Sequence, residues 1–192
     1  MTPALDKAVL RPRMRGLRRR LAEAAPQAAR QAAAHAPLER LCAFEVVGAY
    51  HPHGSEMDPG PLAKRLAEAG AALALPLAAR RDAAFEFRLW TPGDPLAPDA
   101  FGVLSPTEAA PAVRPQLVIA PVLAFDRRGG RLGQGGGHYD RTLQNLRDAG
   151  PVFILGLAFA GQEVEAIPME PHDQRLDAIL TEAGYIAALE ET

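Results

Sequence analysis

The chain has 192 residues and a formal net charge of −2, which fits a single domain over residues 1–192 and excludes a strongly basic protein. Its 48% hydrophobic and 23% charged residues are typical of a globular protein, and its longest apolar runs are too short to cross a bilayer, so no membrane partner is expected. The one cysteine, Cys42, stands in an apolar segment. We therefore expect a buried thiol and a reducing, cytoplasmic location.

The first half of the chain predicts helices followed by short strands. Residues 13–33 read as one or two helices divided near Pro26, beginning at about Pro12 because proline is tolerated only near a helix start. Residues 44–50 read as a buried strand. A helix capped by Asp58, strands over 71–76 and 84–90, and a Pro- and Gly-rich loop over 91–115 follow.

The second half predicts strands separated by a loop and one helix. Residues 116–125 give the strongest strand pattern, and a glycine-rich loop over 126–138 leads into a helix over 139–149. Further strands are expected at 152–158 and 178–181. Apolar strands that alternate with helices predict the α/β class, a three-layer α/β/α sandwich with a mostly parallel, Rossmann-like central sheet. Ligands of such sheets bind beyond the carboxyl ends of the strands, where this loop lies.

The glycine-rich loop has the composition of a phosphate-binding loop. Six of the nine residues from Gly129 to Gly137 are glycine, and glycine lets successive backbone N–H groups turn inward around an anion. The loop runs into a helix N-terminus, which also attracts anions, and Arg131 can bind phosphate through two parallel hydrogen bonds. Neither the Walker A pattern nor the dinucleotide fingerprint matches. A flexible surface loop is the alternative interpretation.

Two carboxylates are candidate ligands for Mg²⁺. Asp140 stands where the helix begins, and Asp173 lies in a Pro-bounded turn after a strand. Mg²⁺ usually takes one or two protein carboxylates together with phosphate oxygens. Asp140 alone would be interpreted as a solvated helix cap, and the sequence leaves open whether the two carboxylates meet.

A cluster of cations occupies the N-terminus. Lys7 and Arg11 are four residues apart and share a face if the segment is helical, and five more arginines follow by Arg20. A solvated basic helix is the plain interpretation, and nucleic-acid binding is the alternative. Because the chain is acidic overall and no aromatic residues are interleaved with the arginines, no nucleic-acid partner is expected.

Together these motifs resemble the 5-formyltetrahydrofolate cyclo-ligase family, also called methenyltetrahydrofolate synthetases. The resemblance covers most of the chain, and its most specific part is the segment 131–141. It is carried by Lys7-x-x-Leu10-Arg11, Tyr50, Gly54-Ser55-Glu56-Met57-Asp58, the segment 121–126, the segment 131–141, Ile167-Pro168 and His172-Asp173. Two residues depart from the pattern: His138, where the family usually has Tyr or Phe, and Pro12.

The resemblance implies an ATP-dependent enzyme that converts 5-formyltetrahydrofolate to 5,10-methenyltetrahydrofolate with release of ADP and phosphate. ATP would phosphorylate the N5-formyl oxygen, the N10 amine would attack the activated carbon, and phosphate would leave. No side chain needs to be modified covalently, so no catalytic residue is assigned. The protein would then contribute positioning and charge neutralisation.

The resemblance also implies a role for each motif residue. Lys7 and Arg11 would contact the ATP phosphates, and Asp140 and Asp173 would hold Mg²⁺. Glu56 would accept hydrogen bonds from the pterin N–H groups, with His51 and Tyr139 against the folate. The other ATP contacts would come from Arg131, Leu132, Gly133, Gln134, Gly135, Gly136, Gly137, His138 and Tyr139.

Two other functions stay open at this point. One is a non-catalytic nucleotide- or RNA-binding protein on the same fold, since a fold does not fix a function, although a mere binder would not need Asp140 and Asp173. The other is a ligase-like enzyme for a different formyl substrate. Glu56 and His51, as candidate substrate-binding residues, would help to distinguish the two substrates. The expected partners are a reduced folate and ATP, and the protein is expected to be a monomer.

Overall fold

The computed structural model describes residues 6–81 and 83–189. Its helices are α1 (Lys7–Ala24), α2 (Ala28–His35), α3 (Leu38–Leu41), α4 (Gly60–Glu68), α5 (His138–Asp148) and the 3₁₀ helix η1 (Ala160–Gln162). Its strands are β1 (Val46–Gly48), β2 (Ala72–Leu77), β3 (Glu86–Leu89), β4 (Ala97–Pro98), β5 (Leu104–Ser105), β6 (Leu117–Pro121), β7 (Ala124–Phe125), β8 (Arg131–Leu132), β9 (Phe153–Leu157), β10 (Ala178–Thr181) and β11 (Gly184–Ala187). Across these ranges, no helix is both long and apolar enough to cross a membrane.

Seven strands in the described part of the chain form one sheet in the order β11-β10-β9-β6-β1-β2-β3. The five inner strands run parallel, and β3 and β11 pair antiparallel at the two edges. The chain moves outward from β1 to β2, returns past β1 to β6, and continues the other way through β9 and β10. This reversal creates a crevice at the carboxyl ends of β1 and β6. The expected α/β class and mostly parallel sheet are confirmed, whereas β11 was not predicted.

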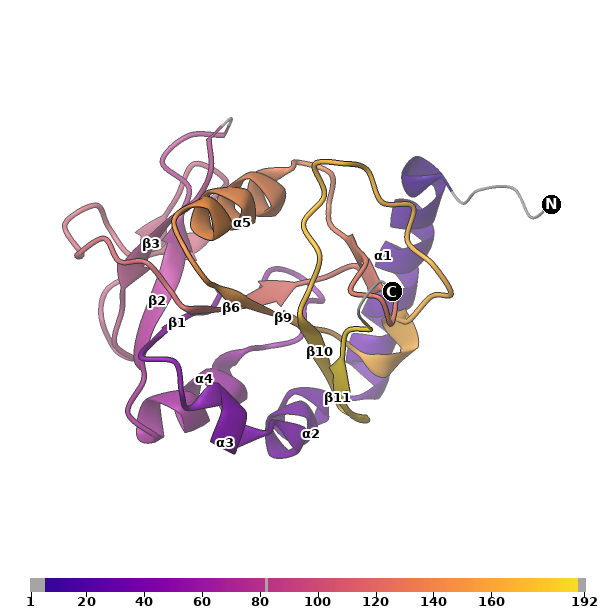
Figure 1. The fold of residues 1–192 in the computed structure, drawn as a ribbon, viewed down its shortest axis with the longest axis horizontal. Coiled ribbons are helices and arrows are strands. Elements are labelled where there is room, and N and C mark those ends of the chain that lie inside the picture. The colour runs from indigo at the N-terminus through magenta and orange to yellow at the C-terminus, as the bar shows by residue number, and fades with distance from the viewer. Residues whose placement is uncertain (1–5, 82, 190–192) are drawn as a thin grey trace.

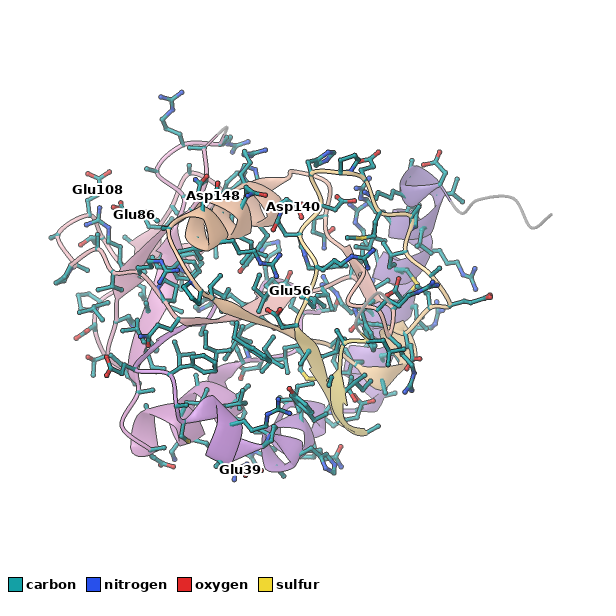
Figure 2. All side chains as sticks on the ribbon, viewed as in Figure 1. Glu39, Glu56, Glu86, Glu108, Asp140 and Asp148 are labelled. Atoms are coloured by element: carbon teal, nitrogen blue, oxygen red, sulfur yellow. The ribbon has the colours of Figure 1, made fainter. Side chains whose placement is uncertain are left out.

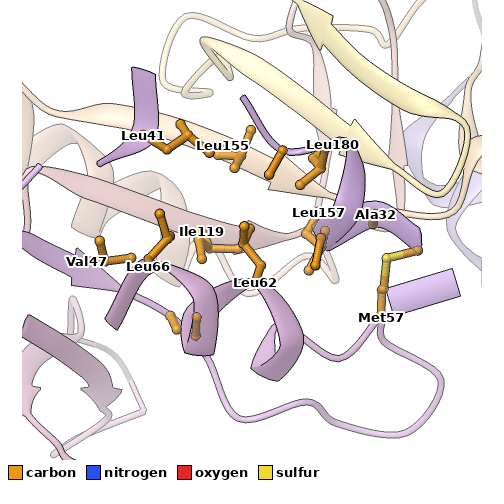
Figure 3. Close-up of a cluster of buried hydrophobic side chains, with 14 of the residues drawn as sticks. Ala32, Leu41, Val47, Met57, Leu62, Leu66, Ile119, Leu155, Leu157 and Leu180 are labelled. Carbon is orange, nitrogen blue, oxygen red and sulfur yellow. The ribbon is translucent and has the colours of Figure 1, made fainter. Parts of the chain in front are cut away.

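Helices cover both faces of the sheet, with α2, α3 and α4 on one side and α5 on the other (Figure 1). Along β6, Leu117 and Ile119 belong to the buried cluster under α2 and α4, which Figure 3 shows. Val118 and Ala120 belong to the opposite cluster, together with Leu143 of α5. Successive side chains of a strand point to opposite faces, and both faces are buried here. The inner strands are therefore apolar at nearly every position.

Helix α1 begins earlier than the sequence predicted. It starts at Lys7, where Asp6 caps it, and Pro12 lies inside it instead of at its start. A proline at that position removes one helical hydrogen bond, so local propensity opposes this helix. The side chains of Leu10 and Met14 are buried against the hairpin of β7 and β8. Packing of this apolar stripe therefore outweighs the local cost of the proline.

The strand predicted over 116–125 is divided in two. β6 ends at Pro121, and β7 begins at Ala124 in a separate two-stranded sheet with β8. Between them, the Nε2 group of the buried Gln162 donates to the carbonyl oxygens of Val122 and Leu123, both at 2.9 Å. Buried carbonyl groups need donors. A glutamine from a distant segment meets that need, and the chain can leave the sheet.

Most other elements lie within two residues of their predicted positions, which is the usual uncertainty of helix and strand ends. The loop over 91–115 contains the two-residue strands β4 and β5, which pair with each other.

Cys42 is exposed, against our expectation of a buried thiol. It directly follows α3, and the preceding residue, Leu41, occupies the core position instead.

We predict that Gln162→Leu destabilises the protein while roughly preserving the volume of the side chain. The Leu123 carbonyl oxygen would lose its donor, and the Val122 carbonyl oxygen would keep only the 3.5 Å contact with Arg18. An unpaired buried acceptor costs about 1–3 kcal/mol. Urea unfolding followed by circular dichroism should show a loss of at least that size. The control is Gln31→Leu on an exposed position of α2, which should change stability by less than about 0.5 kcal/mol. Equal losses in the two variants would contradict this account.

Candidate active site

A cavity opens at the carboxyl ends of β1 and β6, where the reversal of the sheet predicts a ligand site. Its volume is about 490 Å³, within the range typical of small-molecule sites. Its walls come from α1, from the segments that follow β1 and β6, from the glycine-rich loop and from the turn before β10. All the site residues proposed from the sequence line this cavity: Lys7, Arg11, His51, Glu56, Arg131, Leu132, Gly133, Gln134, Gly135, Gly136, Gly137, His138, Tyr139, Asp140 and Asp173.

A buried carboxylate fixes the start of the glycine-rich loop. Asp126 is 3% exposed, and its Oδ1 accepts the backbone N–H groups of Arg128 and Gly130, both at 2.9 Å. Its Oδ2 accepts the backbone N–H of Ile167 at 2.7 Å. Gly129 has a φ of +78° in this turn, and a Cβ there would lie 2.3 Å from a neighbouring carbonyl oxygen. The loop therefore starts as a tightly held turn that is also tied to a distant segment.

The loop presents free backbone donors at the start of α5. Gly137 is the N-cap with a φ of +67°, a left-handed conformation that glycine adopts without strain, and no side chain caps the helix. The first N–H groups of a helix lack intrahelical partners, and the helix dipole favours an anion beside them. The start of α5 can therefore attract an anion without competition from a side-chain cap.

Helix α1 places cations along the cavity. Lys7, Arg11 and Arg18 lie on one face of the helix and line the cavity. Arg11 Nε donates to the carbonyl oxygen of Gly133 at 3.1 Å, and Arg15 hydrogen-bonds the next residue of the loop. The N-terminal helix and the glycine-rich loop are therefore joined directly, although they are far apart in the sequence.

Arg131 and Asp140 form an ion pair beside the loop. One guanidinium nitrogen of Arg131, whose side chain is 3% exposed, lies 2.5 Å from Asp140 Oδ1. The same carboxylate oxygen accepts the backbone N–H of Gln174 at 3.1 Å. The Arg131 guanidinium also lies 5.8 Å from the centre of the Tyr139 ring. Its Nε is buried and finds no hydrogen-bond partner among the described residues, so this cation retains an unused donor.

The turn before β10 brings further carboxylates to the start of α1. Lys7 Nζ forms an ion pair with Asp173 and lies 3.3 Å from Glu170 Oε2. Burial alone would raise the pKa of Asp173, but hydrogen bonds from Lys7 and from the Glu170 backbone outweigh it and lower that pKa. Ligand atoms of Glu170, His172 and Asp173 lie within 4.8 Å of one another. Asp140 and Asp173 thus reach the same cavity from two segments, each paired with a cation.

Glu56 lies near the centre of the view in Figure 2, whereas Glu39 and Glu108 lie at its periphery. The Glu56 side chain is only 12% exposed. Its Oε2 accepts the backbone N–H of His53 at 3.0 Å, and its Oε1 lies 3.5 Å from Nη1 of Arg18. The Glu56 carboxylate, which was predicted to bind the substrate, is therefore held by a backbone N–H group and by a guanidinium group.

Two tyrosines stand close to this carboxylate, the buried Tyr50 and the partly buried Tyr139. Burial raises the pKa of Tyr139, and the negative charge of Glu56 raises it further. The same two causes, in the same order, raise the pKa of Tyr50, whose hydroxyl donates to the Met57 carbonyl. Both phenols are therefore neutral near pH 7. The adjoining cavity wall is apolar and comes from Pro76, Phe85, Phe101, Val103, Leu104 and Pro121.

His138, which departs from the family pattern, sits in an aromatic cluster. Its ring is stacked on Phe85 with the ring centres 5.4 Å apart and meets the ring of Phe101 edge-on at 4.8 Å. Its Nδ1 lies 3.1 Å from the Ala83 carbonyl oxygen and 3.1 Å from Nη2 of Arg141. The imidazole therefore packs as an aromatic ring, with a polar edge that Tyr or Phe would lack at this point.

No role was predicted from the sequence for Asp126, Arg18 or Gln162. Asp126 carried a usable signal, because an aspartate three residues before a glycine pair suits a side-chain-capped turn. Arg18 carried none, since it resembles Arg19 and Arg20 in the sequence and only the fold buries it. Gln162 acts on residues that are distant in the chain and likewise had no local signal.

Fold and cavity together define a doubly wound α/β protein whose ligand cavity lies at the reversal point of the sheet, between a glycine-rich loop and a row of cations. A model of the 5-formyltetrahydrofolate cyclo-ligase family matches residues 4–182. The chain belongs to the 5-formyltetrahydrofolate cyclo-ligase family.

Individual relatives agree with this assignment. The chain is 34% identical to the 5-formyltetrahydrofolate cyclo-ligase of Mycolicibacterium smegmatis over 177 residues, covering 85% of this chain and 89% of the relative. It is 35% identical to that of Escherichia coli K12 over 131 residues, covering 66% and 71%. The solved structure of Aquifex aeolicus 5,10-methenyltetrahydrofolate synthetase matches with a TM-score of 0.74 and 25% identity, covering 97% of this chain and 94% of that one.

We predict that Asp126→Asn loosens the glycine-rich loop. The amide keeps the size of the carboxylate, but its NH₂ group would face at least one backbone N–H, and hydrogen bonds to charged groups contribute about 1.5–3 kcal/mol. Urea unfolding should show a loss of this order, and the Gly130 and Ile167 amides should exchange faster with deuterium. Asp148→Asn, at an exposed position of α5, is the control. Unchanged exchange at both amides would mean that Asp126 does not organise this turn.

Proposed function

We propose that this protein uses ATP and Mg²⁺ to convert 5-formyltetrahydrofolate to 5,10-methenyltetrahydrofolate, with release of ADP and phosphate. The observation that carries the proposal is a single cavity with two unlike parts. One part combines cations, glycine-loop amides and hard carboxylates, which suits a metal-bound triphosphate. The other holds the Glu56 carboxylate beside the rings of Tyr50, Tyr139 and Phe101. The names of the relatives supply the substrate.

We assign the ATP phosphates to the glycine-rich loop and the cations around it. Lys7, Arg11 and Arg131 contribute positive charge, and the uncapped start of α5 contributes backbone donors. Leu132 is buried against α1, so its contact with ATP runs through its main chain. Gly135 has a φ of +103°, and a Cβ there would lie 3.2 Å from Arg11. Glycine at this position therefore leaves the guanidinium its place beside the loop.

The carboxylates of the cavity fit a magnesium ion. Asp140 and Asp173 offer the hard oxygen ligands that Mg²⁺ prefers. Their partners in the structure, Arg131 and Lys7, are cations that a triphosphate would attract, so metal and phosphate would each satisfy one member of an existing ion pair. Glu170 stands next to Asp173 and can support the same ion. When bound, Mg²⁺ neutralises the charge on the phosphate oxygens.

We assign the pterin ring to Glu56. A carboxylate accepts hydrogen bonds from two neighbouring N–H groups of a flat heterocycle, which orients the ring. The rings of Tyr50 and Tyr139, which line the cavity, offer apolar surface to its faces, and His51 lines the same region. This arrangement selects a flat ring with adjacent donors, which a pterin provides.

The chemistry needs positioning more than a reactive side chain. The N5-formyl oxygen attacks the γ-phosphorus of ATP, and ADP leaves. The N10 amine then attacks the formyl carbon and loses its proton, and the former formyl oxygen departs with the phosphate. Lys7, Arg11 and Arg131 neutralise the transferred phosphoryl group, while the apolar wall limits the access of water to the phosphorylated intermediate.

Family membership favours this enzyme over a non-catalytic nucleotide- or RNA-binding protein. Glu56 favours a pterin over another formyl substrate, since an unrelated formyl compound would not need an acceptor among aromatic rings. A single domain over residues 1–192, a monomeric state, a cytoplasmic location and the lack of a nucleic-acid partner stay predictions from the sequence.

We predict that the purified protein forms the methenyl product from 5-formyltetrahydrofolate only when ATP and Mg²⁺ are both present. The appearance of methenylfolate absorbance measures the reaction. EDTA should abolish it, and added Mg²⁺ should restore it. Asp140→Asn should require more Mg²⁺ for half-maximal rate, because one charged ligand is lost; its unfolding midpoint is measured in parallel, since Arg131 loses its partner. Full activity in EDTA would refute the metal assignment, and no product under any condition would refute the proposed function.

We predict that Glu56→Gln weakens folate binding selectively. The amide keeps the shape of the side chain but turns one acceptor into a donor that faces the N–H groups of the pterin. An unpaired buried donor costs about 1–3 kcal/mol, which corresponds to about 5–150-fold weaker binding. Calorimetric titration should show this loss for 5-formyltetrahydrofolate and nearly unchanged affinity for ATP. A matching loss for ATP would count against the assignment.

A further inference from the structure

We propose that Arg18 is a positioning residue for the folate subsite, which fixes the Glu56 carboxylate in the orientation that receives the pterin. The proposal rests on the proposed folate role of Glu56 and extends it to a residue of the N-terminal helix. Arg18 would act through Glu56 and contribute nothing to the ATP phosphates, unlike Lys7 and Arg11 on the same helix face.

The burial of Arg18 sets it apart from the other arginines of α1. It is 6% exposed, whereas Arg13, Arg19 and Arg20 are exposed to solvent. Burial lowers the pKa of the Arg18 guanidinium, and the charge of Glu56 opposes that shift. An arginine stays protonated even so. A buried cation is costly unless it is paired, so the fold keeps Arg18 inside because of the partners it meets there.

Those partners tie together three segments around the cavity. Arg18 Nε donates to Ser55 Oγ at 3.2 Å, and Nη1 lies 3.5 Å from the Val122 carbonyl oxygen and 3.5 Å from Glu56 Oε1. The guanidinium therefore contacts both the residue before Glu56 and Glu56 itself. Arg18 also lines the cavity, so its planar group forms part of the wall next to the carboxylate.

The ion pair with Arg18 determines the orientation of the Glu56 carboxylate, because few other groups hold it. His53 holds one carboxylate oxygen through its backbone N–H, and Arg18 faces the other. Within the described ranges, Arg18 is the cation that forms an ion pair with Glu56. The neighbouring phenols, the buried Tyr50 and the partly buried Tyr139, are neutral and offer no opposing charge. Without Arg18 the carboxylate would keep one anchor and could rotate away from the cavity.

The first experiment compares Arg18→Gln with Arg19→Gln, which removes the same charge from an exposed position of the same helix. For Arg18→Gln we expect the Kd for 5-formyltetrahydrofolate to rise about 10-fold, equivalent to about 1.4 kcal/mol, with the Kd for ATP unchanged. The KM for folate should rise in parallel, and kcat should stay near wild type. Arg19→Gln should match wild type throughout. Equal losses for folate and ATP, or a fall in kcat alone, would overturn the proposal.

A double-mutant cycle separates positioning from a general loss of stability. If Arg18 acts through Glu56, adding Arg18→Gln to Glu56→Gln should not weaken folate binding further. Full additivity of the two losses would overturn the proposal. Arg18→Lys keeps the charge and should retain folate affinity within about threefold of wild type. If Arg18→Gln does not fold, Arg18→Lys still tests the proposal. A loss of folate affinity in Arg18→Lys as large as that in Glu56→Gln would refute the charge-based role.

A measurement without ligand keeps this proposal distinct from the proposed function. The His53 amide donates to Glu56, so its deuterium exchange reports how firmly the carboxylate is held. We expect faster exchange of this amide in Arg18→Gln and wild-type protection in Arg18→Lys. Unchanged exchange in Arg18→Gln would sink the positioning role even if the enzyme is active. Faster exchange in a protein that makes no methenyl product would sink the proposed function alone.

Discussion

The buried carboxylate of Asp126 is the interaction on which the rest of the site depends. Its two oxygens take three backbone N–H groups, one of which belongs to Ile167 far along the chain. A buried charge is tolerated only when its lone pairs are used, so the partners of Asp126 are held at fixed positions. Arg131 directly follows Gly130, which Asp126 holds in the loop. Asp173 lies in the turn that follows Ile167, which Asp126 holds in the distant segment. One carboxylate thereby sets where the cations and the acidic turn of the cavity stand relative to each other.

Helix α1 adds the second constraint. It packs on the separate β7–β8 hairpin and still provides a wall of the cavity. Leu10 and Met14 fasten it to the β7–β8 hairpin, while Lys7, Arg11 and Arg18 face the ligand space. A rigid helix thus presents charge to two parts of one cavity with a spacing set by its own geometry. The same apolar stripe explains why the helix survives a proline in its second turn.

Sequence patterns predicted the features that depend on chain neighbours. Burial on both faces made β6 recognisable, and the contiguous segment 131–141 marked the phosphate loop. Features made by distant residues were missed. The break after Pro121 depends on Gln162, and the short edge strand β11 has no strong pattern of its own. Arg18 cannot be told from Arg19 until the fold buries one of them. Family resemblance identified Glu56 without showing what holds it.

The pairing of Lys7 with Asp173 joins residues 166 positions apart, and this has a consequence for synthesis. During synthesis α1 leaves the ribosome before the segments that it contacts, so its apolar stripe and its cations then lack those partners. The acidic turn that meets Lys7 emerges only after β1, β2, β6 and β9 have been synthesised. The ligand cavity therefore closes only after Asp173 has been synthesised, because a contact between distant residues needs both of them. A chain truncated before this turn would lack part of the cavity wall and could not form the complete binding site.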